Sequence, residues 1–181
     1  MNPSRRQFMQ TIAAVGAATL LPTWGRIGNA TAADAAGPTR IVHLSDIHMR
    51  PDRGAAKALA KCMEKVHELR PRPALILTGG DLVHDARNDT REGAVAKFKL
   101  AKAVLKDTDI IIRHCIGNHD CFGWGPRSKV ATDHAEYGKK MYQDIIGVDK
   151  LTYGFEFGGW HICVVDNILP TNFNNQRGYQ G

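Results

Sequence analysis

Three short apolar segments of this chain each run directly into a group of polar residues, and this repeated arrangement constrains the fold most. The segments are RIVHLSD, ALILTGGD and DIIIRHCI, at residues 40–46, 74–81 and 109–116. Runs of this length that are rich in Ile, Leu and Val predict buried strands. The polar residues that end them are then expected at the strand termini, where a protein places chemistry more often than core packing.

Helical patterns separate the three predicted strands. Residues 54–69 and 91–106 repeat apolar side chains at helical spacing, and Asp133 with Glu136 predicts a capping box that opens a third helix. Residues 151–166 predict two strands joined by a Gly-Gly turn, which is a hairpin pattern. The order strand, helix, strand, helix, strand predicts an α/β fold with a parallel sheet that is covered on both faces.

The polar groups contain residues typical of a metal site. They supply Asp46, His48, Asp81, Asn118 and His119. Parallel strands bring their carboxyl ends to one edge of a sheet, so these side chains are expected to converge. Two carboxylates, an imidazole and an amide oxygen suit Mn, Fe, Zn or Mg, and a carboxylate can bridge two such ions. Taken singly, each Asp could be a turn residue and each His a surface residue; three groups in register favour the metal site.

The four cysteines match no zinc-binding spacing. Cys62, Cys115 and Cys163 stand in apolar surroundings, and we expect them to be buried as small hydrophobic residues. Cys121 directly follows the third polar group, and its sequence context assigns it no role.

The N-terminus has the layout of a bacterial export signal. Arg5 and Arg6 precede a weakly apolar stretch at residues 11–21, and Ala-Thr-Ala at 30–32 is a candidate cleavage site. The arginine pair predicts export by the twin-arginine translocase, to the periplasm or the outside of the cell. The apolar stretch is too short to remain as a stable membrane anchor.

These features divide the chain into an export signal at residues 1–32, a linker at 33–39 and a domain at 40–181. The formal net charge is +6, but three of the arginines lie in the predicted signal. No tract of Lys and Arg predicts a nucleic-acid-binding patch.

The motifs D-I-H, G-G-D and G-N-H-D at these spacings resemble those of the calcineurin-like metallophosphoesterase superfamily. The resemblance implies a four-layer α/β/β/α sandwich with two divalent metal ions. By this resemblance Asp46 and His48 hold the first ion, Asp81 bridges both ions, and Asn118 holds the second. A hydroxide between the ions would be the nucleophile that attacks a small phosphoester substrate.

The same resemblance implies catalytic roles for His119 and Asp120. His119 would face the phosphoryl oxygens and help the leaving group to depart, and Asp120 would orient the His119 ring. Position 84 distinguishes this chain from the purple acid phosphatases, which carry Tyr three residues after the bridging Asp. His84 stands there, so we expect no tyrosinate-bound ferric ion, and His84 is either a loop residue or a residue at the edge of the site. Trp124 is expected to pack at the rim of the site, with stacking on a substrate ring as the alternative.

The 181 residues lack part of the pattern that the resemblance implies. The second half of that pattern would supply a further His and a G-H-x-H pair as metal ligands, and neither is present. We therefore expect residues 40–181 to be the N-terminal part of the sandwich, truncated after the first sheet and a hairpin. The second ion would keep only Asp81 and Asn118, where three protein ligands are usual for a catalytic ion.

Two functions follow from these observations. The motifs favour a metal-dependent hydrolase of phosphomonoesters or phosphodiesters. The missing histidines favour a non-catalytic remnant that binds at most one metal ion. A nucleotide-binding α/β module is disfavoured because the sequence contains neither G-x-G-x-x-G nor a Walker loop.

Overall fold

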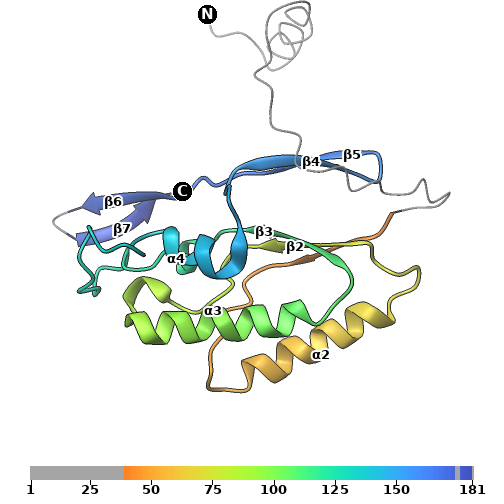
Figure 1. The fold of residues 1–181 in the computed structure, drawn as a ribbon, viewed down its shortest axis with the longest axis horizontal. Coiled ribbons are helices and arrows are strands. Elements are labelled where there is room, and N and C mark those ends of the chain that lie inside the picture. The colour runs from red at the N-terminus through yellow and green to blue at the C-terminus, as the bar shows by residue number, and fades with distance from the viewer. Residues whose placement is uncertain (1–38, 174–175, 181) are drawn as a thin grey trace, which may run out of the picture. The chain divides into compact units, whose positions relative to one another are not determined.

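A three-stranded parallel sheet lies at the centre of the fold (Figure 1). The computed structural model describes residues 39–173 and 176–180, so the predicted export signal and nearly all of the linker lie outside the described residues. The strands are β1 (Ile41–Leu44), β2 (Leu75–Gly79) and β3 (Ile111–Cys115), in the order β1-β2-β3. In the strand register Leu44 pairs with Thr78, and Thr78 pairs with His114. The three predicted strands are therefore confirmed, and their carboxyl ends are level.

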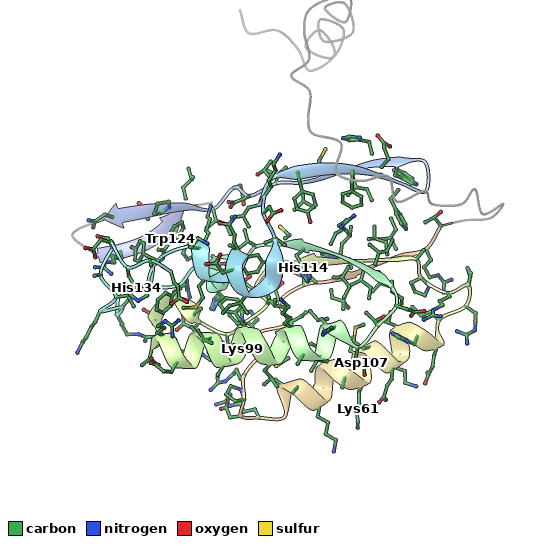
Figure 2. The ribbon with its side chains drawn as sticks, viewed as in Figure 1. Lys61, Lys99, Asp107, His114, Trp124 and His134 are labelled. Carbon is green, nitrogen blue, oxygen red and sulfur yellow. The ribbon has the colours of Figure 1, made fainter. Side chains whose placement is uncertain are left out.

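Two long helices cover one face of this sheet (Figure 1). They are α2 (Ala55–Glu68) and α3 (Arg91–Lys106), close to the predicted bounds. Each buries one stripe of small and apolar residues against the sheet, and apolar side chains fill the space between (Figure 2). Thr90 caps α3, since its hydroxyl accepts a hydrogen bond from the Gly93 amide at 3.1 Å. None of the described helices is long and apolar enough to cross a membrane.

The predicted helix at the capping box of Asp133 and Glu136 is wrong. Turns occupy this segment, and the helical residues come later, in α4 (Lys140–Tyr142) and η3 (Gln143–Gly147). The Glu136 carboxylate instead accepts a hydrogen bond at 2.8 Å from Arg91, which is 45 residues away in the sequence. Glu136 thus forms a tertiary ion pair with Arg91 instead of capping a helix.

The predicted hairpin is confirmed as β4 (Tyr153–Phe157) and β5 (Trp160–Val164), joined by two glycines with positive φ. It lies on the face of the sheet opposite α2 and α3 (Figure 1). The Tyr153 hydroxyl donates to the His114 carbonyl oxygen at 2.8 Å, which fixes the hairpin against β3. Helices, parallel sheet and hairpin form successive layers, in agreement with the predicted α/β class.

A second hairpin was not predicted. It consists of β6 (Leu169–Phe173) and β7 (Gln176–Gln180), which pair antiparallel. The expectation of buried cysteines is also wrong at two positions, because Cys62 and Cys163 are exposed, and Cys115 is only half-buried. On β5, Cys163 lies between the half-buried Ile162 and the buried Val164. Successive side chains of a strand point to opposite faces, so Cys163 lies on the exposed face of the hairpin.

Candidate metal centre

The backbone at the carboxyl edge of the sheet is held in an unusual conformation. Asp46, His48, Asp81 and Asp85 have φ angles of 55°, 47°, 50° and 51°. Non-glycine residues seldom adopt positive φ, and such strain gathers at functional sites. Among the described residues only Arg53 shares this property. Hydrogen bonds between the loops maintain it, including one of 2.9 Å from the His48 amide to the Asp81 carbonyl oxygen.

Two glycines allow the loops after β2 and β3 to touch. A Cβ atom on Gly117 would lie 2.0 Å from the Asp81 amide nitrogen and 2.2 Å from its Oδ1. A Cβ atom on Gly80 would lie 2.8 Å from the Gly117 Cα. Real side chains do not approach so closely, so both positions require glycine. The contact brings the second and third polar groups of the sequence together.

Asp46, His48 and Asp81 form a compact group that we call the acidic cluster. Their nearest donor atoms lie within 4.8 Å of one another. His48 Nε2 is 3.7 Å from Asp46 Oδ1 and 3.8 Å from Asp81 Oδ2. Donors bound tetrahedrally at about 2.1 Å would be about 3.4 Å apart. Two carboxylates and an imidazole at this spacing fit a divalent cation such as Mn, Fe or Zn.

The ring of His48 has one nitrogen without a hydrogen-bond partner among the described residues. This atom, Nδ1, is buried. Asp46, in turn, accepts a hydrogen bond of 2.5 Å from the Ser45 hydroxyl, which orients its carboxylate. The Asp46 carboxylate is therefore fixed by its neighbour, whereas Nδ1 of His48, which is not the nitrogen that faces the carboxylates, still needs a partner.

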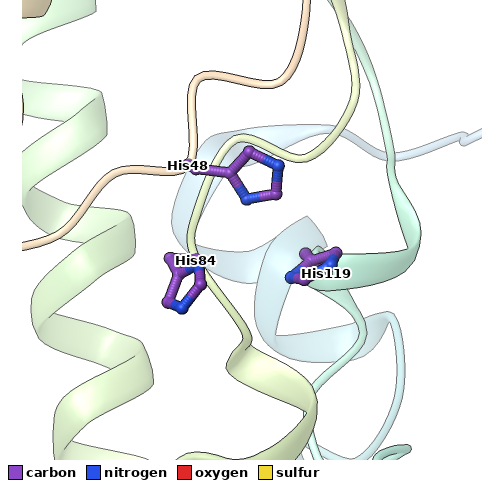
Figure 3. A group of neighbouring side chains, drawn as sticks. All are labelled: His48, His84 and His119. Atoms are coloured by element: carbon purple, nitrogen blue, oxygen red, sulfur yellow. The ribbon is translucent and has the colours of Figure 1, made fainter.

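His84, Arg87 and His119 lie beside the acidic cluster, and we call them the basic cluster. The His119 ring centroid is 4.7 Å from that of His48 and 5.9 Å from that of His84. Figure 3 shows the imidazole rings of His48, His84 and His119 facing a common space from three separate segments. His84 thus lies next to His48 and His119, and its role at the edge of the site remains a prediction. Arg87 was not predicted, and its position in the same loop, six residues after Asp81, was its only signal.

The two clusters have opposite electrostatic character. Burial and then the Arg87 guanidinium lower the pKa of His119. Burial, followed by the charges of Arg50 and Lys97, lowers the pKa of His84. The ring nitrogens of His48, His84 and His119 are also within 4.8 Å of one another. A cation among these three rings would nevertheless lie near a guanidinium, whereas the acidic cluster offers two carboxylates.

Residues 39–178 match the family described as Calcineurin-like phosphoesterase, which is well over half of the chain. The chain belongs to the calcineurin-like phosphoesterase family. The resemblance identified from the sequence motifs is therefore confirmed. Members of this family generally use divalent metal ions, in agreement with the chemistry of the acidic cluster.

The chain shows two further similarities, one to a signal sequence at its N-terminus and one to a protein from Arcobacter nitrofigilis. Residues 2–22 match the twin-arginine translocation pathway signal sequence, which confirms the predicted export route to the periplasm or the outside of the cell. The chain is also 29% identical over 87 residues to a probable glycerophosphodiester phosphodiesterase GpdQ from Arcobacter nitrofigilis. The match covers 44% of this chain and 29% of that relative, so the chain spans under a third of the relative's length.

In this calcineurin-like phosphoesterase Asp120 does not orient His119, and that expectation is wrong. Asp120 is fully buried, and its oxygens accept hydrogen bonds from the amides of Val83 at 3.0 Å, Leu82 at 3.2 Å and Gly117 at 2.9 Å. The short turn η2 (Asn118–Asp120) directs Asp120 inward, away from His119. Burial raises the pKa of Asp120 to about 7, and the three amide donors oppose that rise. Asp120 therefore joins the loops after β2 and β3.

Asp85, rather than Asp120, contacts the His119 ring at Nδ1. Its backbone amide donates to His119 Nδ1 at 3.1 Å. Asn118 opens η2, directly after Gly117, and its role as a metal ligand remains a prediction. The Asp81 Oδ1 atom accepts a hydrogen bond of 2.8 Å from the His119 amide, so the loop after β3 also orients the predicted bridging carboxylate.

Three other residues near the third polar group have structural roles in the phosphoesterase domain. Cys121 is buried, and burial strongly raises the pKa of its thiol, which leaves it unreactive. Trp124 is 6% exposed and belongs to the hydrophobic core, so it is a packing residue as expected but does not lie at the rim. His114 contacts the Thr78 hydroxyl at 3.2 Å, and burial lowers its pKa to about 4.

Proposed function

We propose that this calcineurin-like phosphoesterase hydrolyses phosphomonoesters or phosphodiesters with a pair of divalent metal ions. The observation that carries the proposal is the position of the acidic cluster beside His119, whose ring centroid is 4.7 Å from that of His48. A cation site next to an imidazole provides charge stabilisation and a hydrogen-bond donor at one phosphoryl group. The name of the Arcobacter relative favours diesters as the first class to test.

Each residue in the site has a separate task under this proposal. Asp46 and His48 would hold the first ion, Asp81 would be shared, and Asn118 would hold the second. When bound, divalent ions lower the pKa of water and neutralise charge that develops on phosphorus. His119 donates a hydrogen bond or proton from Nε2 to a phosphoryl or leaving-group oxygen, because its Nδ1 already accepts from the Asp85 amide.

A protein that binds at most one metal ion, without turnover, is the second candidate. The observation in its favour concerns the second ion. That ion would have only Asp81 and Asn118, and Asp81 Oδ1 already accepts a hydrogen bond from the His119 amide. Two protein ligands are fewer than the three that catalytic ions usually have.

One experiment distinguishes the two candidates. The purified protein is incubated with Mn²⁺ and assayed on nitrophenyl monoesters and diesters, and bound metal is measured by elemental analysis. The proposed enzyme binds two ions per chain, and its turnover is lost in Asp81→Ala and His119→Ala. Asp144→Ala, which alters an exposed carboxylate paired with Lys140, serves as the matched control and keeps full activity. One ion or none, with no turnover on either ester class, would establish the alternative.

A further inference from the structure

The ring of His119 faces two hydrogen-bond donors but has only one lone pair to offer them. Arg87 Nη2 is 3.2 Å from His119 Nε2, and the Asp85 amide nitrogen is 3.1 Å from Nδ1. A guanidinium group and a backbone amide can only donate, and a neutral imidazole has one acceptor nitrogen. The Asp85 amide is fixed by a backbone with a φ of 51°, so Nδ1 is the acceptor. Nε2 therefore carries hydrogen and faces Arg87 Nη2, so two donors lie 3.2 Å apart and an acceptor that reaches both would satisfy them.

The charge around Arg87 is also unbalanced. The Asp85 carboxylate is shared by two guanidinium groups, with Arg87 Nε at 3.2 Å and Arg127 Nη2 at 3.3 Å. One negative charge faces two positive charges, which leaves an excess of positive charge. The Arg87 side chain is 17% exposed and that of Arg127 is 78% exposed. The excess charge is less screened by water at Arg87 and has more effect there.

Contacts on several sides hold Arg87 in one geometry. Its Nε atom donates to Asp85, and its guanidinium carbon lies 5.2 Å from the centre of the Tyr179 ring. Its backbone carbonyl oxygen accepts a hydrogen bond of 2.9 Å from the Gly125 amide. A guanidinium fork positioned in advance binds an oxyanion without losing much side-chain entropy.

We propose that Arg87 binds the phosphoryl group of the ligand, with its guanidinium and the His119 Nε2–H donating to oxygens of the same oxyanion. Neither the motifs nor the family match assign a role to Arg87. The inference rests on the proposed function for the choice of a phosphoryl oxyanion as ligand. The acidic cluster would hold the cation and the basic cluster the anion of one metal–phosphate unit. A phosphoester substrate and free phosphate product share this chemistry.

Calorimetric titration with inorganic phosphate tests the inference, on both the metal-free and the Mn²⁺-loaded protein. Arg87→Gln is expected to weaken phosphate binding at least about tenfold, and Arg87→Lys about threefold, because lysine keeps the charge but not the fork. Arg127→Gln is the matched control, since Arg127 pairs with the same Asp85 carboxylate but has no contact with His119. It should stay within about twofold of the wild type, and all three variants should keep the wild-type Mn²⁺ affinity.

The inference is overturned if the wild-type protein does not bind phosphate, or if Arg87→Gln binds it as tightly as Arg127→Gln does. Should Arg87→Gln fail to fold by circular dichroism, Arg87→Lys decides by the same comparison. Nitrophenyl ester assays separate this inference from the proposed function. Phosphate binding that depends on Arg87, without turnover, rejects the hydrolase and keeps the inference. If Arg87→Gln turns over the ester with an unchanged KM and an unchanged phosphate affinity, the hydrolase is kept and the inference is rejected.

Discussion

The acidic and basic clusters arise from the same edge of the sheet but are built in different ways. Every member of the acidic cluster has positive φ, and its position depends on loops that touch through glycines. The basic cluster depends on hydrogen bonds to Asp85, whose backbone amide donates to His119 and whose carboxylate accepts from Arg87. The difference teaches that positive φ at the ligand residues themselves fixes the cation side, whereas a hydrogen-bond network centred on Asp85 fixes the side with excess positive charge.

The largest effect is expected from Gly117→Ala, which would damage both clusters together. Gly117 has an extended backbone with a φ of −113°, so the new methyl group causes harm only by its clash with Asp81. We expect a loss of about 3 kcal/mol in the free energy of unfolding, measured with urea. Gly178→Ala is the control, because its Cβ would meet only Thr171 Cγ2 at 3.4 Å. Equal stability of the two variants would mean that the loops do not depend on their close contact.

The second prediction compares two histidines that lie 5.8 Å apart, ring to ring. His48→Gln should weaken Mn²⁺ binding about a hundredfold, because it removes a donor from the acidic cluster. His84→Gln should change the same affinity by less than about threefold, because His84 lies near Arg50 and Lys97. Calorimetry with Mn²⁺ measures both. An equally large loss in His84→Gln would assign the ion to the three imidazoles and abolish the distinction between the clusters.

A third prediction uses His114, which lies outside both clusters. Burial lowers its pKa from 6.5 to about 4, so the unfolded chain takes up a proton before the folded protein does. The stability that depends on the neutral ring is complete above pH 6.5 and is lost as the pH falls toward 4.

Between about pH 7.5 and about pH 4.5 the wild type should lose about 2 kcal/mol more stability than His114→Gln, in urea unfolding at each pH. Gln keeps a polar partner for Thr78 but does not titrate. His134→Gln, at a turn, is the control and should follow the wild type. If His114→Gln and the wild type lose equal stability, the ring is not buried in its neutral form.

The smallest effect is expected at the cap of α3, away from the site. Thr90→Ala removes the hydroxyl that accepts from Gly93, at a cost of about 1 kcal/mol. Mn²⁺ and phosphate affinities should not change, because neither cluster draws a residue from α3. Thr132→Ala, in an exposed turn, should leave stability unchanged. A fall in ligand affinity with Thr90→Ala would show that the clusters are coupled to the helix layer.

The sequence predicted those parts of the site that follow from strand register. Asp46, His48 and Asp81 come directly after apolar strands, so parallel pairing alone brings them together. The direction of Asp120 could not be predicted in this way, because it depends on the turn of η2 and on three amides from other loops. Arg87 lies in an irregular loop with no periodic pattern to indicate where its side chain points.

The errors in the fold have a similar origin. The capping-box prediction weighed only local sequence, whereas Glu136 pairs with Arg91 from the start of α3. Cys62 lies at the edge of the buried stripe of α2, where a small change in helix orientation decides exposure. Both errors concern residues for which tertiary contacts outweigh local preference.

The hydrogen bonds that assemble the site also bear on the order of folding. Asp120 reaches Leu82 across 38 residues and Val83 across 37, and the bond from Asp85 to His119 spans 34. Contacts of such long sequence separation form only after chain segments that fold locally have come together. A refolding chain should therefore gain its helices first and its ligand-binding edge last, so the return of Mn²⁺ binding would time the final step of folding.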